Sequence, residues 1–172
     1  MGRVTDPKGR VAAVCSSPTA GLLKRPLNEV QINQWGVQGD YHAGPRRRSR
    51  RTGKLKKNDR MISIVAKEVL DDLNRRFSIA IPPGGFGENV LVEKVGDLSD
   101  LQPGDQLLLG TGVVVEVTEQ NEPCANLNIW NKRILYETMG RRGIVGVIKQ
   151  GGTLRPGDGV RLKKSKRNAD PF

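Results

Sequence analysis

Short runs of apolar residues, ended by glycine or proline, recur along most of the chain. The run VAAVC at 11–15 has no helical spacing and predicts a buried strand, with Cys15 as a small core residue. Similar runs predict further strands at 30–32, 59–65, 90–93, 106–109, 113–118, 143–149 and 160–162. A glycine-flanked turn at 110–112 joins two of these strands into a hairpin.

The apolar spacing changes to a helical period in only two places. Val69, Leu70, Leu73 and Phe77 recur at three and four residues, which predicts an amphipathic helix over 66–77. A second helix is expected over 126–139. Seven or so short strands with about two short helices indicate a mostly β fold, a closed or nearly closed β-barrel. We expect one domain over 1–172, with its core at about 11–162.

The net charge of +11 at pH 7 is concentrated in two segments. Eight Lys and Arg residues and no acid occur in 45–57, which looks like an insertion, and five occur in 161–167, where a basic tail (163–172) begins. The rest of the chain therefore carries a net charge of −2. A run of like charges is usually solvated, and aromatic content of 4% offers no stacking platform. A basic RNA- or ribosome-binding β-barrel is thus an alternative that composition disfavours.

Several common classes of protein are excluded by what the sequence lacks. There is no phosphate-binding loop, no dinucleotide fingerprint and no CxxC pair, and one histidine cannot build a zinc site of several histidines. Two cysteines do not form a disulfide framework, and the N-terminal segment has no apolar signal region. No apolar run is long enough for a membrane span. We therefore expect a reducing, cytoplasmic setting and no membrane.

Two segments carry residues suited to chemistry. In GDYH at 39–42, Gly39 lets the backbone approach an anion, and His42 can donate a hydrogen bond or a proton. On local chemistry alone, Asp40 is a turn cap and His42 a surface residue. Cys124 follows a proline and precedes a predicted helix, whose N-terminus favours the thiolate that attacks sulfur or binds a soft metal. The alternative, an inert and partly buried cysteine, stays open at this point.

Four motifs resemble, in order, those of the MOSC domain, the C-terminal domain of molybdenum cofactor sulfurases. GVQGDYH at 36–42 is similar to the GxxGDxH segment, and PGGFGEN at 83–89 to the GxFGEN element. The segment from Asp97 to Asp105 resembles the DLxxLxxGD turn, and Pro123-Cys124 after VVEVT resembles the site of the family's cysteine. Two features depart from the family: Asn121 replaces a basic residue, and Ala125 and Asn126 replace further Cys or His.

The resemblance implies a stand-alone member with the MOSC, pyruvate-kinase-like β-barrel, and it implies roles for individual residues. Cys124 corresponds to the cysteine that carries persulfide sulfur or ligates molybdenum. The other implied contacts to the molybdenum cofactor (molybdopterin) are Gly39, Asp40, His42, Gly87, Glu88 and Asn89. We add Arg60 as a phosphate partner, because a guanidinium presents a bidentate fork.

The function implied by the resemblance is that of a sulfur carrier or molybdenum-cofactor-binding protein. Its implied partners are a cysteine desulfurase or an acceptor molybdoenzyme. Pyridoxal phosphate is expected only on the partner desulfurase, because no lysine here can be singled out as a Schiff base. An alternative within the family is a molybdenum-cofactor-dependent oxidoreductase acting on N-hydroxylated compounds.

Overall fold

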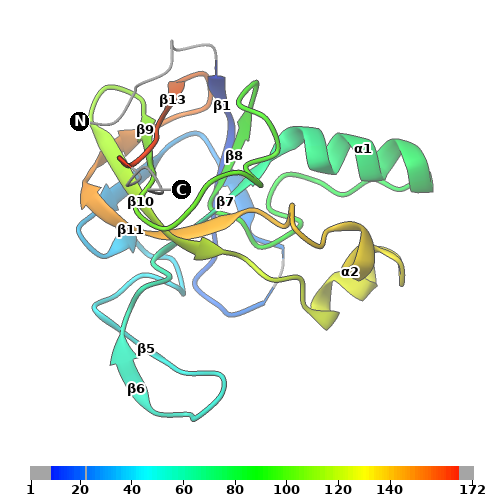
Figure 1. Cartoon of the computed structure of the whole chain (residues 1–172), viewed down its shortest axis with the longest axis horizontal. Coiled ribbons are helices and arrows are strands. Elements are labelled where there is room, and N and C mark those ends of the chain that lie inside the picture. Colours follow the sequence, from blue (N-terminus) through cyan, green and yellow to red (C-terminus); the bar gives the residue numbers. More distant parts are fainter. Residues whose placement is uncertain (1–8, 22, 167–172) are drawn as a thin grey trace, which may run out of the picture.

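The computed structural model describes residues 9–21 and 23–166. Figure 1 shows short strands wound around one core, with helical segments on one side. The helical segments are α1 (Lys67–Phe77), α2 (Ile134–Glu137) and the 3₁₀ helix η1 (Ala125–Ile129). The strands are β1 (Gly9–Ser16), β2 (Arg25–Leu27), β3 (Val30–Asn33), β4 (Gly36–Val37), β5 (Arg46–Arg48), β6 (Leu55–Lys57), β7 (Ile62–Ala66), β8 (Val90–Glu93), β9 (Gln106–Leu109), β10 (Val113–Gln120), β11 (Ile144–Gln150), β12 (Gly152–Leu154) and β13 (Gly159–Lys163).

Among these described residues, seven strands close into a barrel. The order around it is β1, β13, β9, β10, β11, β7 and β8, and β8 pairs back with β1. Only β7 and β8 run parallel, and α1 lies in the connection between them because parallel neighbours need a long crossover. The predicted mostly β fold with a closed barrel is confirmed.

Alternating apolar residues fill the barrel. Along β10, Val113, Val115 and Val117 are buried while the residues between them are partly exposed, as expected of a strand with one face inward. Helix α1 covers the barrel with Val69, Leu70 and Leu73, as its apolar spacing predicts. Within the described ranges, no helix has the length and apolar content to cross a membrane.

The predicted helix over 126–139 is wrong as a continuous element. The chain forms η1, then breaks, and restarts as the four-residue α2. The Asn131 side chain accepts the backbone N–H of Arg133 at 2.9 Å. Such a bond competes with the helical backbone pattern, so the segment bends where a continuous helix would need that N–H.

The basic insertion forms a β-hairpin and not a shapeless loop. Strands β5 and β6 pair from Arg46–Lys57 to Arg48–Leu55, and the hairpin projects from the barrel in Figure 1. At its base, the Asp59 carboxylate lies 2.7 Å from Arg47 and 3.6 Å from Lys56. The remaining cations of the hairpin face solvent. The predicted C-terminal tail from residue 167 onward lies outside the described residues.

Candidate functional site around Asp40, His42 and Cys124

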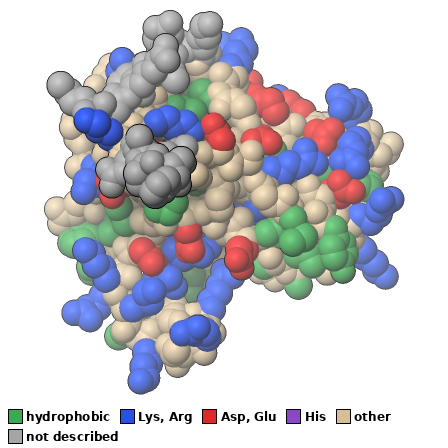
Figure 2. All heavy atoms as spheres, in the orientation of Figure 1, with side chains coloured by type: hydrophobic (Ala, Val, Ile, Leu, Met, Phe, Trp, Pro, Cys, Tyr) green, Lys and Arg blue, Asp and Glu red, His purple; other side chains and the backbone are tan. Residues whose placement is uncertain are grey.

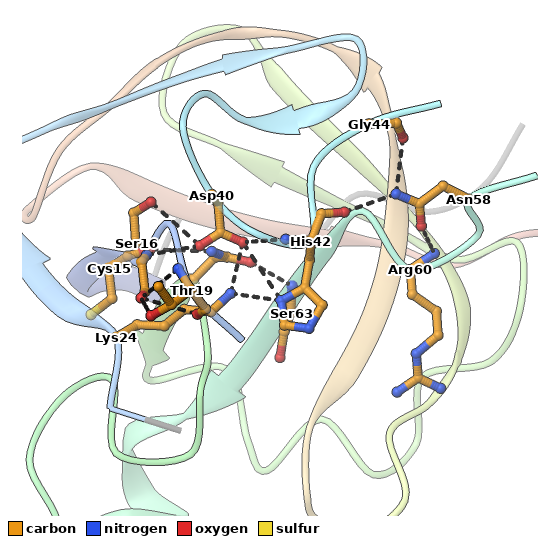
Figure 3. Close-up of polar contacts among 12 residues, drawn as sticks. Cys15, Ser16, Thr19, Lys24, Asp40, His42, Gly44, Asn58, Arg60 and Ser63 are labelled. Carbon is orange, nitrogen blue, oxygen red and sulfur yellow. Dashed lines mark hydrogen bonds and ion pairs between the residues drawn. The ribbon is translucent and has the colours of Figure 1, made fainter. Parts of the chain in front are cut away.

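A buried ion pair stands at the centre of the GDYH segment. The Lys24 ammonium lies 2.8 Å from the Asp40 carboxylate, and neither side chain is exposed to solvent. Figure 3 shows the two pointing toward one another beside His42. Backbone N–H groups of Ser17 and His42 also donate to Asp40, at 3.0 and 3.1 Å. Asp40 is therefore held by Ser17, Lys24 and His42 and is more than a local turn cap.

The contacts of Asp40 keep its carboxylate ionised. Burial alone would raise the pKa of Asp40, but the contacts with His42 and the charge of Lys24 outweigh burial and hold that pKa well below its usual range. Burial lowers the pKa of Lys24, and the carboxylate of Asp40 opposes that effect. The carboxylate is thus negatively charged at neutral pH.

His42 is oriented by the same lysine. The Lys24 Nζ lies 3.0 Å from His42 Nδ1, and an ammonium can only donate, so Nδ1 is the acceptor. The Asp40 carboxylate is 3.6 Å from the same nitrogen, too far for a hydrogen bond. A neutral imidazole that accepts at Nδ1 carries its proton on Nε2. Because the side chain is 39% exposed, His42 can offer this N–H outward as a hydrogen-bond donor.

A chain of hydrogen bonds leads from His42 toward the cysteine. Asn58 donates to the carbonyls of His42 and Gly44, and its Oδ1 accepts the backbone N–H of Arg60. The Arg60 guanidinium donates to Glu119 at 2.7 Å and to Asn121 at 2.8 Å. Figure 3 shows Asn58 bridging His42 and Arg60. Arg60 therefore fixes the end of β10 that leads to Cys124, and its role as a phosphate partner stays a prediction.

The PGGFGEN segment forms a tight loop whose acidic and amide side chains face inward. The Glu88 carboxylate accepts the backbone N–H groups of Gly84 and Phe86, each at 3.0 Å, and burial raises its pKa. Asn89 accepts from the Ser63 N–H and donates to the Cys15 carbonyl. Both side chains are fully buried, so they shape the loop from within, and contact of either with a cofactor stays a prediction.

The two glycines predicted to shape the site both adopt the left-handed conformation. Gly39 has φ +86° and Gly87 has φ +76°, values that side chains rarely tolerate. Apart from its neighbours in the chain, no atom of the described residues lies within 4 Å of where a Cβ on Gly39 would stand. The backbone beside Asp40 is thus open to an approaching group.

Cys124 lies directly before η1, in the short connection that follows β10. Its carbonyl accepts the N–H of Leu127, which closes the first turn of η1, and the thiol is free and partly exposed. Trp130 ties η1 to the PGGFGEN loop by donating to the Gly85 carbonyl at 2.9 Å. Cys15, the other free cysteine, is fully buried, and burial raises its pKa to about 12.

A cavity of about 530 Å³ opens beside Pro123, the residue before the cysteine. Its walls are mainly apolar and include Leu135, Tyr136 and Met139. Tyr136 and Met139 are exposed by 72% and 68%, and Figure 2 shows apolar side chains gathered on the surface over α2. The cavity offers room for an apolar group beside Pro123, the residue that precedes Cys124 in the chain.

The structure thus unites Asp40 and His42 directly, and hydrogen bonds through Asn58 and Arg60 connect His42 to Asn121, three residues before Cys124. Sequence reasoning missed Lys24, which precedes the turn by many residues. A lysine beside apolar Leu23 and Pro26 gives no periodic signal of burial. The strand pairing that brings it to Asp40 is visible only in three dimensions.

Comparison with known proteins agrees with this architecture. A sequence profile of the MOSC domain matches residues 38–161, which is most of the chain. The chain belongs to the MOSC domain family. It is 24% identical over 174 residues to YuaD of Bacillus subtilis (strain 168), described as a candidate metal-sulfur cluster biosynthesis protein. That match covers 88% of this chain and 91% of YuaD.

Solved MOSC structures share the fold. The crystal structure of YuaD superposes with a TM-score of 0.85 at 22% identity, covering 96% of this chain and 100% of YuaD. YiiM from Geobacillus stearothermophilus gives a TM-score of 0.64 at 20% identity, covering 90% of this chain and 74% of YiiM. YiiM from Escherichia coli gives 0.62 at 20% identity, with 94% and 72% covered.

Proposed function

We propose that this MOSC protein is a sulfur carrier, with Cys124 holding the sulfur as a persulfide during molybdenum-cofactor or metal–sulfur chemistry. The contrast between the two free cysteines carries this proposal. Cys15 is fully buried with a raised pKa of about 12, whereas Cys124 is partly exposed at the junction of a strand and a helix. Family membership and the name of YuaD support the same class of chemistry.

The chemical step uses the thiolate of Cys124 as nucleophile. It attacks the terminal sulfur of a donor persulfide, a new S–S bond forms on Cys124, and the donor leaves as its own thiolate. No net oxidation occurs, because one sulfane sulfur moves from one thiol to another. The donor we propose is the persulfide of a cysteine desulfurase that holds pyridoxal phosphate. The acceptor is a molybdoenzyme or its cofactor.

The residues present also fit the molybdenum cofactor. Arg60 and Arg142 would supply positive charge for its phosphate, and the buried Arg142 has two guanidinium nitrogens without a hydrogen-bond partner among the described residues. Cys124 would offer a soft ligand. Within those residues no group of three His, Cys, Asp or Glu could hold a metal, so the other ligands would come from the cofactor itself. When bound, the cofactor supplies two-electron redox chemistry.

Sulfur loading tests the proposal. Purified protein is incubated with a cysteine desulfurase and cysteine, and its peptides are then examined by mass spectrometry. We expect one added sulfur atom on the peptide that contains Cys124, none on Cys15, and none on Cys124→Ser. Cys15→Ser is the matched control and should load like the wild type. Sulfur carriage by Cys124 would be refuted if the wild type took up no sulfur, or if Cys124→Ser took up as much sulfur as the wild type.

The apolar cavity beside Pro123 favours one further candidate function, reduction of small N-hydroxylated compounds by a bound cofactor. The cavity volume of about 530 Å³ suits a small organic molecule. Cofactor-loaded protein with an artificial electron donor should then reduce such a compound, and Cys124→Ser should abolish turnover. Absence of molybdenum from protein made in cofactor-competent cells would rule this candidate out.

A further inference from the structure

Arg142 is a buried cation that forms no direct ion pair within the described residues. Its residue exposure is 5%, and its only hydrogen bond among the described residues runs from Nη2 to the Phe86 carbonyl. The Nε and Nη1 atoms have no partner there, and no carboxylate in that part of the chain forms an ion pair with it. Its guanidinium also stacks over the Phe86 ring at 5.0 Å. A buried charge left unpaired destabilises a fold, so the position calls for an anion.

The sheet register brings Arg142 next to the cysteine segment. Strand β10 pairs with β11 as far as Gln120 and Ile144, and Asn121 then donates to the Gly143 carbonyl at 2.8 Å. Beyond this pair, the next residues of the two segments are Glu122 and Arg142, and Glu122 is followed by Pro123 and Cys124. The two segments therefore leave the sheet side by side.

The PGGFGEN loop accepts hydrogen bonds from both Arg142 and the segment that follows Cys124. Arg142 donates to the Phe86 carbonyl, and Trp130, on the segment that Cys124 begins, donates to the adjacent Gly85 carbonyl. One loop therefore binds both the guanidinium and the end of η1. Arg142 and the Cys124 turn are supported by the same two consecutive residues.

The neighbouring acid, Glu88, interacts electrostatically with Arg142 but forms no ion pair with it within the described residues. Both carboxylate oxygens of Glu88 accept backbone N–H groups of its own loop, and burial raises the pKa of that carboxyl. Burial lowers the pKa of Arg142, Glu88 and Cys124 oppose the shift, and Arg60 and Arg50 add to it. Glu88 and Cys124 are thus the groups whose negative forms favour the charged guanidinium, and the Glu88 oxygens are directed to the backbone N–H groups of their own loop.

We propose that Arg142 is the counter-cation of the sulfur anion held at Cys124, and that this site therefore prefers anionic sulfur species. The proposal rests on the proposed function for the identity of that sulfur: the thiolate before transfer and the persulfide anion after it. Arg142 is a positioning residue, since it acts through Cys124. The class of donor it implies is a small or protein-bound persulfide that arrives as an anion.

Two alkylating reagents measure the charge around Cys124 without any sulfur donor. Iodoacetate is an anion and iodoacetamide is neutral, and both consume the same thiolate. The ratio of their rates therefore reports the local field and cancels the amount of thiolate. Cys15 is fully buried, so mass spectrometry will assign the reaction to Cys124.

We expect the ratio of iodoacetate to iodoacetamide rates to exceed that of N-acetylcysteine in the wild type, and to fall about fivefold in Arg142→Gln, because a buried charge is weakly screened. Arg142→Lys keeps the charge and should keep most of the ratio. Arg141→Gln is the matched control: it removes the same charge one residue away, where Arg141 pairs with Asp72 at 3.0 Å, and should leave the ratio unchanged.

An equal ratio in wild type and N-acetylcysteine would overturn the proposal, even if Arg142→Gln does not fold. Equal ratios in folded Arg142→Gln and Arg141→Gln would overturn it as well. This test uses neither donor nor cofactor. If the rate ratio depends on Arg142 but the desulfurase loads no sulfur, the anion preference stands and the sulfur-carrier function is refuted. If sulfur is loaded but the rate ratio does not depend on Arg142, the sulfur-carrier function stands and the role of Arg142 is refuted.

Discussion

Replacing Lys24 by methionine removes the ammonium from the centre of the site and keeps a side chain of similar length. The Asp40 carboxylate would then stay buried with the N–H groups of Ser17 and His42 as its main remaining donors. Removing one partner of a buried pair costs about 3–5 kcal/mol, since the other charge is left uncompensated. Because two backbone donors remain, we expect a loss at the lower end, about 3 kcal/mol.

Urea denaturation gives this loss as a change in the free energy of unfolding. Lys67→Met is the matched control, because Lys67 pairs with Asp71 at 2.7 Å but the two side chains are 39% and 58% exposed. An exposed pair of this kind contributes about 0.3–0.5 kcal/mol. The double variant Lys24→Met/Asp40→Asn should recover part of the loss, since the neutral amide needs no counter-charge. Equal losses for Lys24→Met and Lys67→Met would refute the reasoning.

Three further outcomes follow from the same contacts. The pKa of Asp40 is lower in the folded state than in the unfolded state, so the ionised carboxylate stabilises the fold above the ordinary carboxyl pKa of about 4. This stabilisation is lost as the pH falls below that value, so the urea midpoint of Asp40→Asn should fall less below about pH 4 than that of the wild type. Gly84→Ala should lower the thermal midpoint sharply or prevent folding, because φ is +83° and a Cβ would stand 1.9 Å from the Lys24 carbonyl; a wild-type midpoint would contradict this. Arg50→Glu/Arg51→Glu in the hairpin should leave folding and sulfur loading unchanged, and the wild type should release single-stranded RNA at about 150 mM salt; RNA binding that persists there and is lost in the variant would favour the nucleic-acid alternative.

Much of the barrel could be predicted because its strands carry their own signals. Strands β1, β9, β10, β11 and β13 are apolar runs bounded by turn residues, and the spacing of α1 identifies its buried face. Strands of two or three residues such as β4 and β12 give no period that a sequence could show. At the break between η1 and α2, the Asn131 side chain accepts the Arg133 N–H, a local bond that competes with the helical pattern and that apolar spacing does not reveal.

The candidate site divides in the same way. The motif residues Asp40, His42 and Cys124 are visible in the sequence because turns and a proline set them apart. Lys24 and Arg142 cannot be found in the same way. A buried cation is recognised from the residues that surround it in the fold, and the local sequence around each is also typical of an exposed cation. Their burial follows from pairings between distant segments: Lys24 with the turn at 39–42, and Arg142 with the loop at 84–89.

The state of Cys124 in protein isolated directly from cells tests the central claim most directly. The protein is alkylated rapidly and digested. The mass of the peptide then distinguishes an alkylated thiol, an alkylated persulfide and an unreacted cysteine, and Cys15 serves as the internal reference in the same sample. We predict a persulfide fraction on Cys124 that disappears on treatment with a reductant and is absent from Cys15. A Cys124 found only as a plain thiol, in cells with an active desulfurase, would contradict the account.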